Sequence, residues 1–320
     1  MKTASALLAV LLSLAATASI AQDNWPAKQV RIIVPSAPGG GTDLYARLLA
    51  FGLSESLKQQ FFVDNRPGGN GAIGAEAVAH SAPDGYTILV SASPALVVNP
   101  LLYKNLPYDA YRDFAPVSAG VITPLIFVVH PSVPARSLAE LVALGKKEPG
   151  KLAYGSSQLA SATSLGVQIL EQMSGARFNL IPYKGLGQAL QNLLSGQISF
   201  MLSDFPIVLT HVKSGKLIAL AATHHTKVLP NVPTTEEAGF PIGDIVASFM
   251  VTAPAGVPAP IVHRLNGEIN RLMKTPAIAE KLEAHLFIPL FGSPEDFAVR
   301  LKKQRAMWAD AIAKLGIKAE

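Results

Sequence analysis

The sequence contains no cysteine at any of its 320 positions. This absence excludes disulfide bonds, cysteine nucleophiles and metal sites built from thiolates. A lipid-anchored exported protein would also need a cysteine just after its cleavage point, so we expect no lipid anchor. Without disulfides, the stability of the fold must come from a large hydrophobic core.

Charge is also scarce, because charged residues make up 15% of the chain and the formal net charge is a modest +5. The lysine pairs at 146–147 and 302–303 are isolated, and no dense basic cluster is present. We therefore expect no nucleic-acid partner. A mild positive field still favours small anions. Beyond the first residues no run of 18 apolar residues occurs, so we expect no membrane-spanning segment.

The first residues have the order of a secretory signal peptide. Lys2 precedes an uncharged apolar stretch over 4–16, and small residues lead up to Ala21. This pattern predicts a signal peptide over 1–21 that is cleaved after Ala21. The alternative, a buried first helix, is disfavoured because the stretch has no polar face. The rest of the chain is long enough for two domains.

Short β-branched runs alternate with longer helical patterns, which predicts an α/β fold with parallel strands covered by helices. The expected strands lie at 30–34, 61–64, 87–90, 125–129, 151–154 and 180–183, and the expected helices at 43–59, 72–80, 138–147 and 162–173. Capping boxes that begin at Ser137 and Ser293 predict two helix starts. The first is the start of the helix at 138–147, and the second is the start of a C-terminal helix.

Two proline-rich joints divide the chain, one at 123–124 and one at 253–258. If the chain crosses between domains at both joints, residues 126–247 form one lobe inserted into a second lobe made of 23–125 and 248–320. Two lobes joined by a two-strand hinge enclose a cleft, and clefts of this kind bind ligands.

Three glycines, Gly39 to Gly41, separate the first strand from a helix start, and Thr42 is the expected cap of that helix. Backbone N–H groups at a helix N-terminus favour an anion, and glycines allow it to approach. The alternative is an ordinary tight turn. A P-loop is excluded because no lysine follows Gly41, and a dinucleotide fingerprint there fails at Leu44.

A literal G-x-G-x-x-G occurs at 69–74, but the next strand ends without the acidic residue that a dinucleotide site needs. Neither a G-x-S-x-G elbow nor an H-E-x-x-H motif is present. The pair His224-His225 faces two ways on a strand, which disfavours a metal site. No cofactor and no metal are therefore expected. The spacing of Ser203, Asp204 and His211 does not support a catalytic arrangement for acyl transfer. Phe205 is either a core residue or an aromatic contact for a ligand.

A series of ordered motifs resembles one known family from about Trp25 onward. They include WPAKQVRIIVPSAPGGGTDLYARLLA, VDNRPGGNGAIGAEAVAHSAPDGYTILV, NPLLYKNLPYD, EPGKLAYGSS, IPYKG and LPNVPTTEEAGFP. The sequence is similar to the Bug family, the periplasmic solute receptors of tripartite tricarboxylate transporters. This resemblance implies a type II periplasmic binding protein whose two lobes close on an organic carboxylate and then dock on integral membrane components.

The resemblance also implies the binding residues, carried over by position. From the first lobe these are Pro38, Gly39, Gly40, Thr42, Asp43 and Ser93, and from the second Ser156, Ser157, Tyr183, Lys184 and Ser203. The expected protein is a periplasmic monomer and not an enzyme, and its ligand is a small organic mono- or dicarboxylate. A soluble carboxylate sensor for a signalling receptor and an exported serine hydrolase remain as alternatives.

The sequence departs from the usual family pattern at two places. Ser164 stands where relatives often have histidine, and Leu202-Ser203-Asp204 stands where they often have Phe-Asp-Asn. Both changes fall on the second-lobe side of the expected cleft. The identity of the ligand therefore does not transfer from any relative.

Overall fold

A computed structural model of the chain describes residues 25–157, 161–243 and 245–315. The predicted signal peptide lies outside the described residues. Along the first part of the chain the elements are β1 (Val30–Val34), α2 (Gly41–Leu57), β2 (Phe61–Asn65), α3 (Ala72–Ala79), β3 (Thr87–Ala92), α4 (Asn99–Leu102) and β4 (Phe114–Val129). Two short helical turns, at Gly69–Gly71 and Pro94–Val98, precede α3 and α4.

The middle of the chain forms α5 (Leu138–Lys147), β5 (Ala153–Ser156), α6 (Ala162–Ser174), β6 (Asn179–Pro182), α7 (Leu186–Leu194), β7 (Phe200–Asp204), α8 (Phe205–Lys213) and β8 (Ile218–Ala222). The last part forms β9 (Val246–Pro254), α9 (Ala259–Leu272), α10 (Pro276–Ala284), β10 (Ile288–Pro289) and α11 (Pro294–Leu315). This alternation confirms the predicted α/β class.

The ten strands of the described chain form one curled sheet in the order β2-β1-β3-β9-β4-β7-β5-β6, with β8 and β10 also paired to β4. Neighbours β1, β2 and β3 are parallel, as are β5, β6 and β7, whereas β4 and β9 are antiparallel to their neighbours. Parallel neighbours need crossover connections, which helices supply here.

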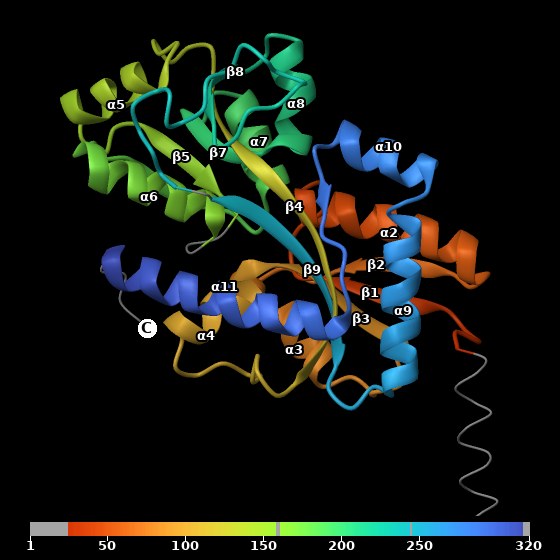
Figure 1. Cartoon of the computed structure of the whole chain (residues 1–320). Coiled ribbons are helices and arrows are strands. Elements are labelled where there is room, and N and C mark those ends of the chain that lie inside the picture. Colours follow the sequence, from red (N-terminus) through yellow and green to blue (C-terminus); the bar gives the residue numbers. More distant parts are fainter. Residues whose placement is uncertain (1–24, 158–160, 244, 316–320) are drawn as a thin grey trace, which may run out of the picture.

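Strand β4 joins two strand sets. Its residues from Phe114 to Pro124 pair with β9, whereas residues from Leu125 to Val129 pair with β7 and β8. We call β1, β2, β3, β9 and β10 the first strand set, and β5, β6, β7 and β8 the second strand set. In Figure 1 β4 and β9 run side by side from one set toward the other.

The predicted strand at 125–129 is thus only the end of a strand of 16 residues. Gly120 adopts a positive φ of 64° and the register with β9 shifts twice between Pro116 and Val121. These irregularities break the apolar pattern that marks a strand in the sequence. The prediction therefore identified only the regular end of β4.

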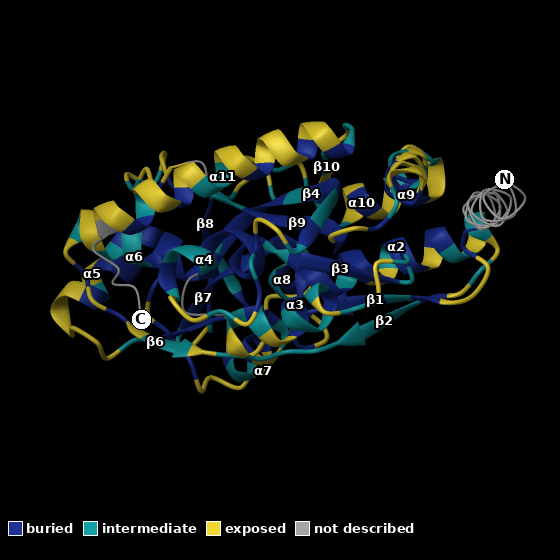
Figure 2. Ribbon diagram, turned by 90° about the horizontal axis from the view of Figure 1, so that it is seen from below, coloured by how far each residue is buried: buried dark blue, intermediate teal, exposed yellow. Residues whose placement is uncertain are grey.

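Buried side chains fill both sides of the sheet, and exposed residues lie on the outer faces of helices such as α5, α9 and α11 (Figure 2). One core cluster runs through both strand sets, from Val30 through Val121 and Phe127 to Phe200. No helix among the described residues is long and apolar enough to span a bilayer.

Candidate functional site

The triglycine loop leads directly into α2, but Thr42 does not cap it. The helix begins at Gly41, and the extended residue Gly40 occupies the cap position without a side-chain hydrogen bond. The expectation that Thr42 caps the helix was therefore wrong, because the helix starts one residue before it. Gly39 has a φ of 84°, a left-handed conformation that a residue without a Cβ adopts most easily.

Asp43 fixes the shape of this loop from within its own helix. Its carboxylate accepts hydrogen bonds from the Gly39 N–H at 3.0 Å, Arg47 at 2.9 Å and Asn65 at 2.9 Å. Burial raises the pKa of Asp43, but the hydrogen bonds from Arg47, Gly39 and Asn65 outweigh it and lower the pKa overall. Asp43 is therefore ionised in this conformation, and its carboxylate holds the loop in place.

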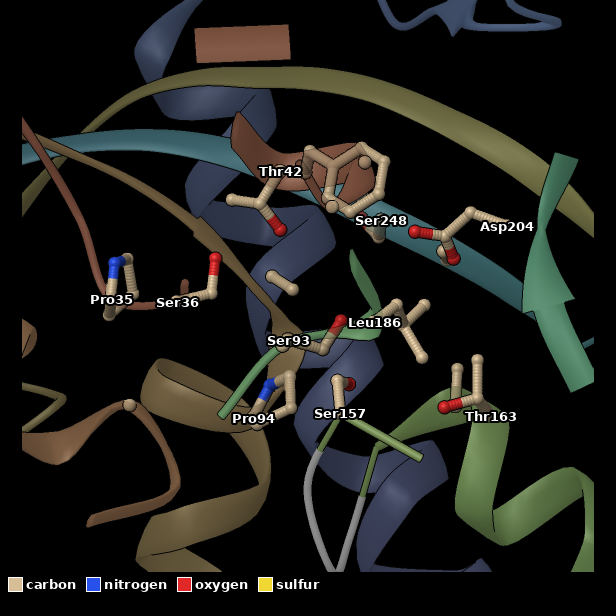
Figure 3. A pocket seen from close by; sticks show the side chains of 18 of the residues that line it. Pro35, Ser36, Thr42, Ser93, Pro94, Ser157, Thr163, Leu186, Asp204 and Ser248 are labelled. Carbon is tan, nitrogen blue, oxygen red and sulfur yellow. The ribbon is translucent and has the colours of Figure 1, made fainter. Parts of the chain in front are cut away.

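A pocket lies at the end of the triglycine loop and between the two strand sets, with a cavity volume of about 60 Å³. Figure 3 shows hydroxyl-bearing side chains around it, such as Thr42, Ser93, Ser157 and Thr163. The polar side chains that line it are Ser36, Thr42, Ser93 and Ser248 from the first part of the fold and Ser157, Thr163 and Asp204 from the second. No lysine, arginine or histidine is among its described lining residues.

Asp204 is the ionisable side chain of this pocket. It ends β7, and only 4% of the residue is exposed. Burial raises the pKa of Asp204 to about 7, although a hydrogen bond from the Gly41 N–H opposes the rise. The close approach of the Asp204 carboxylate to the Gly41 backbone requires glycine at position 41, because an added Cβ there would contact this carboxylate and lie 2.7 Å from Phe249.

A network of hydroxyls supports the pocket at the start of α6. Ser156 is fully buried, and its Oγ lies 2.7 Å from Thr163 Oγ1 and 2.9 Å from Ser161 Oγ. Ser161 and Ser164 form a capping box for α6. Ser164, at the position where relatives often have histidine, therefore serves the helix start, and Ser156 orients Thr163, which lines the cavity.

The triglycine loop also contacts the turn before α7. The Ala37 N–H donates to the Lys184 carbonyl at 3.0 Å, and a Cβ added at Gly187 would lie 2.8 Å from the Pro38 carbonyl oxygen. Such spacing is possible only because Gly187 has no side chain. The loop after β1 and the start of α7 therefore meet backbone to backbone at one side of the pocket.

The predicted site residues separate into three groups. Those that line the pocket are Gly40, Thr42, Ser93 and Ser157. Those that lie around it are Pro38, Gly39, Asp43, Ser156 and Ser203. Those that line a neighbouring cavity of about 490 Å³ are Tyr183 and Lys184, and this cavity shares Gly71 and Ser157 with the pocket.

Sequence reasoning missed several residues of the pocket. They are Ser36, Gly41, Thr163, Asp204 and Ser248. Asp204 carried a usable signal, since it is an acidic residue at the end of a buried strand in an α/β sheet. Gly41 belongs to the triglycine turn, which is itself predicted to be an anion site. Ser36, Thr163 and Ser248 carried no signal, because isolated small polar residues are common in turns.

Other chemistry considered from the sequence finds little support. The Ser203 hydroxyl is buried and donates to the backbone carbonyl of Asp204, not to a histidine. His225 pairs with Glu237 at 3.0 Å in an exposed position. Phe205 is the first residue of α8, is buried in a core cluster with residues of α7 and α8, and does not line the pocket. Among the described residues no group of histidines and carboxylates is arranged to hold a metal ion.

The predicted helix starts agree in part with the structure. The Ser137 hydroxyl accepts a hydrogen bond from the Glu140 N–H as expected. The Glu140 carboxylate, however, accepts from the backbone N–H of Arg136 and not from that of Ser137. Ser293 and Asp296 form reciprocal bonds at the start of α11. The second capping box is therefore confirmed, and the first is half formed.

Comparison with known proteins agrees with this architecture. The family described as tripartite tricarboxylate transporter family receptor matches residues 45–317. Protein BugT of Bordetella pertussis is 38% identical over 98% of each chain.

Two solved structures are similar along nearly the whole fold. Rpa4515 of R. palustris with adipate has a TM-score of 0.89 at 33% identity, covering 92% of this chain and 100% of the other. MatC of Rhodopseudomonas palustris with bound malate has a TM-score of 0.85 at 27% identity, covering 90% and 100%. The chain therefore belongs to the Bug/TctC family of periplasmic solute-binding proteins, which are receptors and not enzymes.

Proposed function

We propose that this protein is the solute receptor of a tripartite tricarboxylate transporter and binds a small organic mono- or dicarboxylate. The observation that carries the proposal is a small, hydroxyl-lined pocket at a helix N-terminus between the two strand sets. O–H and N–H donors together with a helix dipole stabilise an anion without a cationic side chain. Adipate and malate in the two similar structures are ligands of the same chemical class.

Binding proceeds by closure of two lobes, residues 23–125 with 248–320 and residues 126–247, about the hinge formed by the two strands β4 and β9. The change of partners along β4 at Leu125 supports this boundary. Each lobe supplies part of the pocket, so ligand contacts favour the closed form over the open one. The proposed binding set comprises the eleven residues named from the sequence, extended by Ser36, Thr163 and Ser248. Within it, Tyr183 and Lys184 would contact only a part of the ligand that reaches the neighbouring cavity.

In this proposal the leader at 1–21 is cleaved after Ala21, and the mature monomer acts in the periplasm without a cofactor. The closed form then docks on the membrane components. Recognition of closure by the transporter would distinguish loaded from empty receptor.

Calorimetry on refolded, ligand-free protein tests the proposal with a panel that includes adipate, malate and monocarboxylates. Replacing Ser93 or Thr163 by alanine removes a hydrogen bond to a charged group, which is worth about 1.5–3 kcal/mol, or roughly ten- to a hundredfold in Kd. Ser195→Ala changes an exposed hydroxyl after α7 and should leave the Kd unchanged. If no acid of the panel binds more tightly than millimolar, the proposed function is wrong.

A further inference from the structure

The pocket contains a carboxyl group of its own. Asp204 is the ionisable side chain among the described lining residues, and it accepts a hydrogen bond from Gly41, the first residue of α2. In Figure 3 its carboxyl extends from the end of β7 toward the side of the pocket where Thr42 and Ser248 lie. A ligand carboxylate bound in a cavity of about 60 Å³ would therefore lie beside this group.

No lysine, arginine or histidine is among the described residues that line the pocket, so none of them compensates a second negative charge there. The charged and titratable groups on the surrounding elements have contacts outside the pocket. On α2, Asp43 pairs with Arg47 and Tyr45 contacts Met273. Lys184 lines the neighbouring cavity, His211 lies in the last turn of α8, and His285 packs against Phe287. The strand residues beside Asp204, Leu125 on β4 and Ala247 to Phe249 on β9, are uncharged. Two ionised carboxylates would thus face each other in a buried space.

We propose that Asp204 holds a proton whenever a carboxylate ligand occupies the pocket, and that an ionised Asp204 takes this proton from solvent together with the anion. This inference rests on the proposed function. The ionised acid becomes a carboxylic acid, and its new O–H donates to the ligand carboxylate while its carbonyl oxygen accepts from the Gly41 N–H. Two neighbouring carboxyl groups that share one proton replace electrostatic repulsion with a hydrogen bond.

Burial supports this exchange at physiological pH. The pKa of Asp204 is raised to about 7, whereas free carboxylic acids ionise near 4. Between these values the ligand is already an anion while Asp204 still holds its proton. Above about pH 7 the unliganded protein must take up a proton in order to bind, and this requirement weakens binding tenfold for each pH unit.

The test is calorimetry with adipate and malate between pH 5.5 and 8.5 on the wild type, Asp204→Asn and Asp310→Asn. In the wild type the Kd should rise up to tenfold per pH unit above about 7. Asp204→Asn cannot ionise, so its Kd should change less than twofold over the whole range. Asp310 is an exposed carboxylate on α11, and its replacement should leave the wild-type slope intact.

A second measurement on the wild type alone covers the case in which Asp204→Asn does not fold. Titrations at pH 8 in two buffers of different ionisation enthalpy should give an uptake of about one proton per ligand. A flat Kd with no proton uptake would refute the inference while leaving carboxylate binding in place. Tighter binding at higher pH would also refute it, because the ionised Asp204 would then pair with a cationic group. Failure of both acids to bind at every pH would reject the inference together with the proposed function.

Discussion

Replacing Asp204 by asparagine should stabilise the ligand-free protein, and the gain should grow with pH. Burial raises the folded-state pKa of Asp204 from its ordinary value of 3.8 to about 7. Below pH 3.8 the carboxyl is protonated in both folded and unfolded chains, so it makes no difference there. Between 3.8 and about 7 the unfolded chain loses the proton first, which favours unfolding; above about 7 the penalty is constant.

The magnitude follows from 1.36 kcal/mol for each pH unit. Relative to Asp204→Asn, the free energy of unfolding of the wild type should fall by about 2 kcal/mol by pH 5.5 and by about 4 kcal/mol by pH 7.5. The second figure is an upper limit that applies to the closed form. Urea unfolding of both proteins at pH 4, 5.5, 7 and 8 gives the difference directly. The comparison cancels every other titrating group.

Asp310→Asn serves as the control for this experiment. Its carboxylate is exposed on α11, so the stability difference from the wild type should not grow with pH. A difference between wild type and Asp204→Asn that stays constant from pH 4 to 8 would refute the reasoning. It would mean that Asp204 reaches solvent in the ligand-free protein and that its burial belongs to the closed form alone.

Glycine substitutions test the closed pocket. Gly187→Ala should favour the helix α7 by about 1 kcal/mol but raise the carboxylate Kd at least tenfold, because the new Cβ would lie 2.8 Å from the Pro38 carbonyl oxygen. Gly267→Ala, in the open face of α9, should give the same helix gain with an unchanged Kd in the same calorimetric titration. Gly41→Ala should lower stability by about 1–3 kcal/mol and weaken binding, because the Cβ meets Asp204 and the core. Gly40→Ala should leave stability unchanged, since its Cβ would lie at an ordinary 3.8 Å from Leu186 N; an equal loss of stability at positions 40 and 41 would contradict this reading of the loop.

The regular elements were predictable from the sequence because their side chains carry the helix or strand period. The run over 30–34 is buried along almost its whole length and became β1, and the helix at 138–147 matches α5 at both ends. The first eleven residues of β4 were not predicted. They include Pro116, Gly120 and two register shifts, so local preference is opposed there and pairing with β9 determines the structure.

The site was predictable at the level of loops and not of side chains. Ends of parallel strands meet at one edge of a sheet, so Gly40, Ser93 and Ser157 could be brought together by sequence reasoning. On β7, however, the resemblance carried over by position selected Ser203, whereas the neighbouring Asp204 lines the cavity. Successive side chains point to opposite faces, and only the pairing of β7 with β4 determines which of the two faces the pocket.

The loop amides expected to bind the ligand largely have partners within the protein. The Gly39 N–H donates to Asp43, the Ala37 N–H to the Lys184 carbonyl, and the Gly41 N–H to Asp204. Of these three amides, only the Gly41 N–H is bonded to a side chain that lines the pocket, because the other two bonds hold the loop and its contact with the turn before α7. Recognition therefore depends on the hydroxyls around the cavity and on the protonation of Asp204, as well as on the amides at the start of α2. In this arrangement the triglycine loop positions the donors, and the buried acid decides at which pH an anion is accepted.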